Sequence, residues 1–232
     1  MKQTRIVALA LAGAVLLFAV PQARAQNPVI GLISKVIQDV THRASGQEWE
    51  KATRGQTLAS GDMVKTGAKS FAVLKLKDNS LLRLREESEV VVTGTLRGKE
   101  FSKSIQVRQG VVGFNIKKQG PDELFRFSSP TSVASVKGTA GVLCVNGSDT
   151  LTVVEGLVSL ANTVSNTSVD VPAGYTGISR PDGSVESRIS TAAELRAAED
   201  AMRTGDQPRQ LKLELKNSQG QQKDLIIDFK EQ

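Results

Sequence analysis

Four basic side chains are the residues of this sequence with types and spacing suited to recognising a ligand. They occupy alternate positions in two neighbouring apolar–polar runs: Lys75, Lys77, Arg83 and Arg85. Because successive side chains of a β-strand point to opposite faces, each run places its basic residues on one face. A cluster of cations attracts acidic protein segments or anionic material of a cell envelope. The spacing therefore predicts an interaction surface formed by these four residues.

The same four residues also fit a solvated surface without a partner. Glu50, Glu86 and Glu87 are acidic residues that could supply counterions. Exposed ion pairs contribute at most ~1 kcal/mol to stability, and like charges directly opposite each other in a sheet are unfavourable. Both interpretations, a docking surface and a solvated face, follow from the pattern.

Residues that could perform catalysis are few. His42 is the only histidine, so a multi-histidine metal site is excluded and a hydrolase would need a cleft that joins His42 to a nucleophile. Its polar surroundings predict an exposed surface histidine. Ser128 and Ser129 have no other base available, and Cys144 lies in an apolar run where a lone cysteine packs as a small hydrophobic residue. The sequence predicts no catalytic residue, no metal, no cofactor and no enzyme activity.

The composition also argues against a nucleic-acid partner. No glycine-rich phosphate loop joins a strand to a helix, and aromatic residues make up 4% of the chain, which is too few for a base-stacking platform. The net charge of +6 falls to +3 if Lys2, Arg5 and Arg24 leave with a cleaved leader. A charge of that size does not require a polyanion.

The two basic runs flank Asp78-Asn79-Ser80 and predict a β-hairpin. A three-residue loop at this position gives one apolar face, and Asn79 tolerates the positive φ that such loops need. The register predicted from this loop has three pairs: Leu76 with Leu82, Leu74 with Leu84, and Lys75 with Arg83.

Short β-prone runs separated by turn residues continue through most of the chain. Asn146-Gly147 and Glu155-Gly156 are hairpin signals between three consecutive runs. The other strands are expected at 29–40, 89–95, 104–108, 111–116, 124–128, 132–136, 141–145, 151–154, 157–160, 169–171 and 175–179. Many short strands and few helical patterns predict an all-β fold, either a β-sandwich or a β-roll.

The C-terminal part, residues 190–232, has a different pattern and is expected to be a helix followed by a hairpin. Thr191 and Glu194 have capping-box spacing, and the helix they begin is expected to end at Gly205. Two alternating runs then start at Leu211 and Leu225. They predict a terminal hairpin, which either docks on the all-β domain of residues 26–189 or pairs with a partner.

The N-terminal residues 1–25 have the pattern of a cleavable signal peptide. Lys2 and Arg5 precede an apolar run that is short for a membrane span, and Ala23-Arg24-Ala25 fits a cleavage site. Cleavage after Ala25 would leave a periplasmic or secreted chain, with no membrane span in the mature part.

Five short motifs in a fixed order resemble the FecR family of periplasmic domains. They are Gly61-Asp62, Thr66-Gly67, Asp78-Asn79-Ser80, Lys137-Gly138-Thr139 and Glu155-Gly156. The resemblance covers roughly residues 55–177. It implies a non-catalytic module for sensing or interaction that acts through protein contacts in the bacterial envelope. An envelope-associated binder of glycan or another polyanion is the alternative.

Two departures from the family pattern limit what the resemblance implies. Asn79 stands where the family usually has glycine, a change that preserves the turn. The FecR regulator also has a cytoplasmic segment that binds a sigma factor and a membrane span, whereas this chain is expected to begin with a cleavable leader. Transmembrane control of a sigma factor is therefore not implied. The expected partner is an envelope protein, with an anionic glycan as the alternative.

Overall fold

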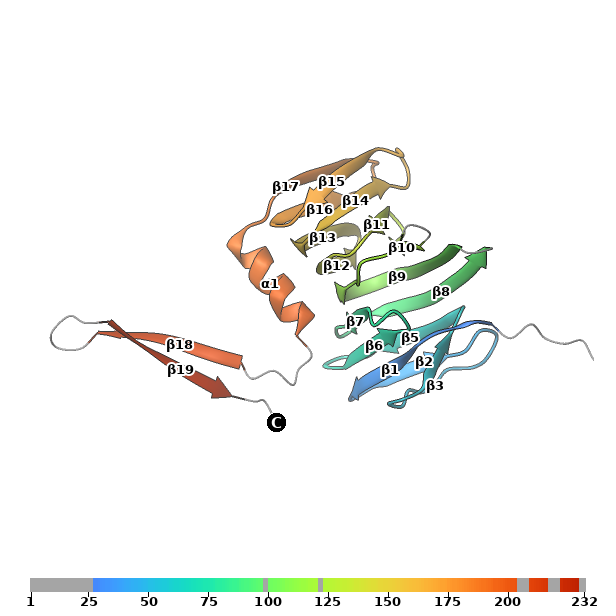
Figure 1. Ribbon diagram of the computed structural model, residues 1–232, viewed down its shortest axis with the longest axis horizontal. Coiled ribbons are helices and arrows are strands. Elements are labelled where there is room, and N and C mark those ends of the chain that lie inside the picture. The colour runs from blue at the N-terminus through green and yellow to red at the C-terminus, as the bar shows by residue number, and fades with distance from the viewer. Residues whose placement is uncertain (1–26, 98–99, 121–122, 204–208, 217–221, 230–232) are drawn as a thin grey trace, which may run out of the picture.

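The computed structural model describes residues 27–97, 100–120, 123–203, 209–216 and 222–229 (Figure 1). Within these ranges the chain forms strands β1 to β19 and one helix, α1, which confirms the all-β prediction with a helix near the C-terminus. The proposed signal peptide, residues 1–25, lies outside the described residues, as does Gly205.

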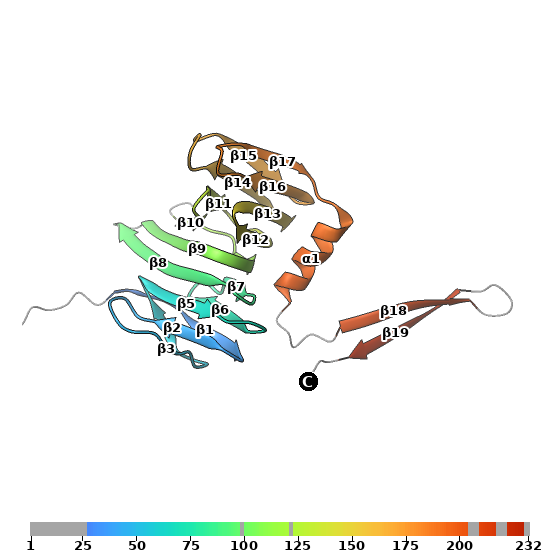
Figure 2. The same cartoon turned by 180° about the vertical axis from the view of Figure 1, so that it is seen from behind.

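Seventeen of the described strands form two layers, which we call sheet A and sheet B. Sheet A contains, in spatial order, β4 (Thr57–Ala59), β1 (Val29–Ile37), β6 (Phe71–Leu76), β7 (Leu81–Leu84), β9 (Glu100–Asn115), β12 (Ala140–Asn146), β13 (Ser148–Glu155), β16 (Tyr175–Ser179) and β17 (Val185–Ile189). Sheet B contains β3 (Glu50–Lys51), β2 (Val40–Arg43), β5 (Asp62–Thr66), β8 (Glu89–Arg97), β9 again, β10 (Glu123–Ser128), β11 (Ser132–Val136), β14 (Leu157–Asn162) and β15 (Ser168–Pro172). The strands are stacked from β1–β3 at one end to β15–β17 at the other (Figures 1 and 2).

Strand β9 joins the two sheets. Its first part pairs with β8 and, in parallel, with β10, and its second part pairs with β7 and β12. Two separate strands were predicted here, and the structure shows that they are one. The change of sheet occurs at Gly110, which has a φ of +97°. A Cβ atom at this position would lie 2.4 Å from the Cα atom of Ser88, so a side chain has no room.

A single hydrophobic core fills the space between the sheets. The alternating positions of the strands supply it, because one face of each sheet is turned inward. Phe114 of β9 and Phe127 of β10 have ring centroids 4.8 Å apart, and Phe125 lies 5.3 Å from Phe127. All three rings are buried. Their contacts hold the two layers together at the centre of the stack.

The β6–β7 hairpin forms as predicted but in a different register. Lys75 was expected opposite Arg83, whereas the structure pairs Val73 with Arg83 and Leu74 with Leu82. The predicted register is therefore wrong by two residues. A shift of two keeps every side chain on its face, so the apolar face still points into the core.

The hairpin loop keeps its predicted length. It consists of Lys77-Asp78-Asn79, because the N–H of Leu76 donates to the carbonyl of Ser80. Asn79 has a φ of +63°, as the turn chemistry required.

The two other predicted hairpins differ in outcome. Residues Asn146-Gly147 connect β12 and β13, which pair as expected. Glu155-Gly156 does not close a hairpin: β13 pairs with β12 and β16 in sheet A, whereas β14 pairs with β11 and β15 in sheet B. This turn carries the chain from one sheet to the other, and the hairpin prediction there is wrong.

Helix α1 (Ala192–Met202) covers part of the outer face of sheet A (Figure 2). Ala198 and Ala201 are buried against Val142 of β12, with Val111 and Val154 at the margin. Small residues on the helix allow its backbone to approach the sheet closely. The capping box of α1 is present as predicted.

Strands β18 (Arg209–Lys216) and β19 (Gln222–Phe229) pair antiparallel and form a two-stranded sheet of their own. This confirms the predicted terminal hairpin. It lies to one side of the stacked sheets, beyond the C-terminal end of α1 (Figure 1). Across the described residues, none of the helices has the length and apolarity needed to cross a membrane.

Candidate functional site

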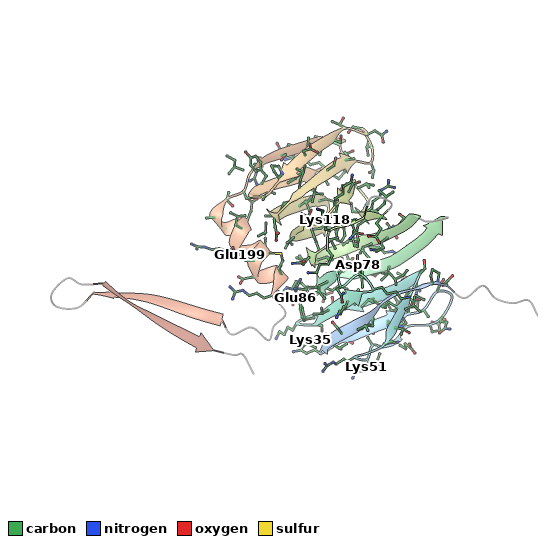
Figure 3. The ribbon with its side chains drawn as sticks, in the orientation of Figure 1. Lys35, Lys51, Asp78, Glu86, Lys118 and Glu199 are labelled. Atoms are coloured by element: carbon green, nitrogen blue, oxygen red, sulfur yellow. The ribbon has the colours of Figure 1, made fainter. Side chains whose placement is uncertain are left out.

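The four predicted basic residues do not form one solvated patch. They all belong to the β6–β7 hairpin at the outer face of sheet A: Lys75 and Lys77 are exposed, Arg85 is half-buried and Arg83 is buried. Lys35 and Glu86 lie near the same end of the sheet, close to the C-terminal end of α1 (Figure 3). The region where this hairpin meets α1 is the candidate functional site.

Arg85 fastens the C-terminal end of α1 to sheet A. Its Nε atom donates to the carbonyl of Ala201 at 3.1 Å, and Nη2 donates to the carbonyls of Asp200 and of Arg203, the latter at 3.0 Å. A cation suits this position because the last carbonyls of a helix carry partial negative charge. The guanidinium also lies 4.8 Å from the ring centroid of Phe71. Arg85 is therefore engaged within the protein.

A second arginine fastens the N-terminal end of α1. Arg188 of β17 donates two hydrogen bonds to the carboxylate of Glu194, at 3.0 and 2.7 Å. The N–H of Thr191 donates to the same carboxylate, and the Thr191 side chain accepts from the N–H of Glu194. Helix α1 is thus held at both ends by arginines from different strands.

Acid is expected to loosen the N-terminal end of α1. The hydrogen bonds from Arg188 and Thr191 lower the pKa of Glu194 from 4.5 to about 2. Because the folded state has the lower pKa, this carboxylate stabilises the fold above about pH 4.5, and its contribution is lost as the pH falls towards 2. Amide hydrogen exchange of α1 between pH 2 and 6 should show protection falling in the wild type. In Glu194→Gln, the α1 amides should be less protected at pH 6, and their protection should change little between pH 2 and 6. Identical pH profiles for the wild type and this variant would contradict the role assigned to Glu194.

The last turn of α1 rests directly on the backbone of β9. A Cβ atom at Gly113 would lie 2.5 Å from the carbonyl oxygen of Ala201. Gly113 is opposite Arg83 on one side and Val142 on the other. The missing side chain at Gly113 is what lets α1 lie this close.

His42 is buried, which contradicts the predicted surface position. It is 3% exposed, its Nε2 lies 3.1 Å from Oδ2 of Asp62, and its Nδ1 lies 2.9 Å from Nε2 of Gln56. Asp62 also accepts from the N–H groups of Ser45 and Ala59. The aspartate of the first motif therefore ties β2, β5 and their loops together through this histidine.

The aspartate of the hairpin loop has a similar structural role. Oδ2 of Asp78 forms an ion pair with Nζ of Lys103, which is 2% exposed, and accepts from Gln119 at 3.2 Å. Burial alone would raise the pKa of Asp78, but hydrogen bonds from Lys103, the N–H of Ser80 and Gln119 outweigh it, so the pKa is lowered. The loop of the candidate site is thereby anchored to β9.

A third polar cluster was missed by sequence reasoning. Asp149 of β13 is 1% exposed and accepts hydrogen bonds from the hydroxyls of Ser129, Thr131 and Ser132, the last at 2.7 Å. Ser129, considered above as a nucleophile, thus donates to a carboxylate. The chain spacing of 17 to 20 residues between these partners gives no local signal.

Cys144 is half-buried on β12. Burial and the nearby Asp149 raise the pKa of its thiol, which disfavours the thiolate needed for nucleophilic attack. Among the described residues, no group of three or more histidine, cysteine, aspartate or glutamate side chains is arranged to hold a metal ion.

The central part of the chain matches a known protein family. Residues 62–159, from β5 to β14, match the family model described as FecR protein. A search of curated proteins found no match. Two crystal structures of a candidate anti-sigma factor from Parabacteroides distasonis ATCC 8503 are similar to this chain. The first has a TM-score of 0.50 at 12% identity over 58% of this chain and 63% of that chain. The second has a TM-score of 0.49 at 11% identity over 58% and 62%.

This chain thus spans less than two thirds of the length of those structures. At 12% identity, the likeness to the first structure concerns the fold alone. The FecR match includes the site hairpin, Gly113 and the Asp78–Lys103 pair, and it ends before α1.

Proposed function

We propose that this chain, which contains a FecR domain over residues 62–159, is a non-catalytic periplasmic module that senses or transmits a signal through protein contacts in the bacterial envelope. The FecR match and the fold shared with a candidate anti-sigma factor support a regulatory role. The single observation that supports a protein partner most strongly is the β18–β19 hairpin, which forms a sheet of its own.

A two-stranded hairpin is marginally stable in water by itself. Its strands also present backbone edges, which are common docking sites for another strand. The hairpin follows α1 in the chain, and α1 is fastened to sheet A by Arg85 and Arg188. A partner that binds the hairpin would thus be attached to the domain at a defined place.

The periplasmic location in this proposal depends on cleavage of residues 1–25. FecR domains belong to envelope-associated proteins, which supports the location. The mature chain should begin at Gln26 and be released by osmotic shock. Mass spectrometry of the released protein identifies its first residue. An uncleaved start, or recovery of the protein only in the cytoplasmic fraction, would overturn the location.

Deleting residues 206–232 is expected to abolish partner capture while leaving the FecR domain folded. The test places a photo-reactive amino acid at position 213, in β18, and cross-links in living cells. The matched control places it at Lys51, an exposed residue of β3. We expect one envelope protein to be captured from position 213 and not from position 51. The truncated chain, tested by co-purification, should no longer retain that protein.

Loss of the captured protein supports a contact through the hairpin only if the truncated chain is still folded. Its circular dichroism spectrum and melting temperature, compared with those of the full mature chain, test this. Equal capture from both positions, or retention of the protein by the truncated chain, would contradict a hairpin-mediated contact.

A second candidate function is binding of an anionic glycan. The exposed side chains of Lys75 and Lys77 favour it. Sedimentation with purified cell-wall material distinguishes the two functions, because electrostatic binding falls steeply with added salt. Salt-sensitive sedimentation that survives deletion of the hairpin would support the glycan and not the protein partner.

A further inference from the structure

The guanidinium of Arg83 is buried, and two of its nitrogen atoms have no acceptor among the described residues. The residue is 9% exposed, and its Nε and Nη1 atoms are buried with no hydrogen-bond partner. Buried polar groups in native proteins are almost always hydrogen-bonded, and a buried charge is normally paired. Arg83 differs in this respect from Arg85, two residues away, which donates to three carbonyls.

The nearby strands offer Arg83 no acceptor of their own. Across the sheet it is flanked by Val73 of β6 and Gly113 of β9. An apolar side chain and a residue without a side chain therefore border it. Among the described residues, the same row of paired residues continues to Lys35 of β1, opposite Val73, and to Val142 of β12, opposite Gly113. The last turn of α1 lies over Gly113.

The carboxylates of adjoining segments are engaged elsewhere. Glu86 accepts from the N–H of Lys69, and Asp78 pairs with Lys103. Asp200, at the end of α1, lies 3.5 Å from Nε of Arg203. These acidic side chains already have partners of their own, so the positive charge of Arg83 is not matched by them.

The surroundings reinforce the positive charge. Lys75 pairs with Leu81, two positions before Arg83 on β7, so it is a diagonal neighbour on the same face. Lys75 is exposed and stands at the rim. Burial lowers the pKa of the Arg83 guanidinium, which means that the site as it stands disfavours the charge. A bound anion would reverse that effect.

We propose that Arg83 is a binding site for an oxyanion, a carboxylate or a phosphate group, with Lys75 assisting at the rim. Arginine is the side chain best suited to both groups, because its fixed N–H donors match their oxygen atoms. The site lies beside the end of α1, so an anion bound there would contact the hairpin and lie next to the helix. The proposal does not depend on the protein partner proposed above.

The test follows the Nε–H signal of Arg83 by NMR in the ¹⁵N-labelled mature chain. Sodium acetate, sodium phosphate and sodium chloride are titrated at matched ionic strength. We expect the signal, assigned by its loss in Arg83→Lys, to shift and saturate with acetate, phosphate or both, and not with chloride. Acetate alone identifies a carboxylate site, and phosphate alone identifies a phosphate site.

Thermal unfolding provides a second readout. At about tenfold excess over its Kd, the effective anion should raise the Tm of the wild type by about 4 °C relative to chloride. Arg83→Met should lose this rise, and Lys75→Ala should weaken binding several-fold. Lys51→Ala, which changes an exposed lysine of β3 in sheet B, is the matched control and should behave as the wild type.

The proposal is overturned if chloride produces the same saturable shift, or if neither anion shifts the signal. A rise in Tm that persists in Arg83→Met would also overturn it. If Arg83→Met does not fold, Arg83→Gln replaces it in the thermal experiment, and the NMR titration of the wild type decides by itself.

Discussion

Replacing Asp78 by alanine is expected to lower the free energy of unfolding by about 3–5 kcal/mol, because it breaks a buried ion pair by removing the carboxylate and keeping the ammonium group of Lys103. Lys103 is 2% exposed, and its Nζ atom donates to the carboxylate of Asp78 and to the amide oxygen of Gln119. The amide of Gln119 would remain, but a neutral oxygen compensates a buried cation less well. Chemical unfolding with urea measures the loss.

Two further variants separate the charge from the hydrogen bonds. Asp78→Asn keeps one of the two accepting oxygens, which can accept from Ser80 or from Lys103, so it should cost less than alanine. The double variant Asp78→Ala/Lys103→Met removes both charges and should be more stable than Asp78→Ala alone. If adding Lys103→Met lowers stability further, the ion pair is not the source of the effect.

The same carboxylate predicts a pH dependence. The pKa of Asp78 is lowered in the folded state, so its contribution is present above the unfolded-state pKa and is lost as the pH falls through the folded-state value. The difference in stability between wild type and Asp78→Ala should shrink in acid.

Replacing Gly113 by alanine is expected to detach α1 from sheet A. The new Cβ atom would lie 2.5 Å from the carbonyl oxygen of Ala201, and backbone atoms cannot move aside as a flexible side chain can. The helix would lose its packing against Val142 and the hydrogen bonds from Arg85. Hydrogen bonds to charged groups contribute about 1.5–3 kcal/mol each, so a loss of about 3 kcal/mol is expected at this contact.

The predicted loss of stability in Gly113→Ala is opposite in sign to the effect of strand propensity alone. Alanine in place of glycine within a strand should by itself be stabilising by about 0.5–1 kcal/mol. Hydrogen exchange of the α1 amides measures the detachment, and Gly120→Ala, where the nearest atom to a new Cβ is 3.7 Å away, is the matched control. Unchanged protection of α1 in Gly113→Ala would show that the helix can shift without loosening.

Local signals in the sequence predicted the local features of the fold. The turn at Asn79 and the capping box of Thr191 and Glu194 depend on residues at most three positions apart, and the structure contains both. The register of the β6–β7 hairpin was predicted wrongly because alternation has a period of two. A shift of two residues leaves the hydrophobic pattern unchanged, so the alternation of apolar and polar residues does not distinguish the two registers.

The features that sequence reasoning missed depend on contacts between distant segments. His42 lies in a polar segment, and its burial follows from Asp62, twenty residues away. Glu155-Gly156 has residues typical of a hairpin turn, but β14 does not pair with β13. It pairs with β11 and β15 in sheet B. Of the four basic residues proposed as a surface, Arg83 and Arg85 are covered or engaged because α1, 115 residues later in the chain, ends beside them. Whether Lys75 and Lys77 contact a partner stays a prediction.

The position of β9 determines the order in which this protein can assemble. In the described sheets, strands β1 to β8 pair among themselves and with β9, and strands β10 to β17 pair among themselves and with β9, but the two groups do not pair with each other. During synthesis or export from the N-terminus, the first group can therefore complete its hydrogen bonding as soon as β9 has emerged. The later strands then add to an edge that is already in place, which shortens their conformational search. The sixteen-residue strand β9 thus provides the paired edge to which β10 and β12 of the second group add.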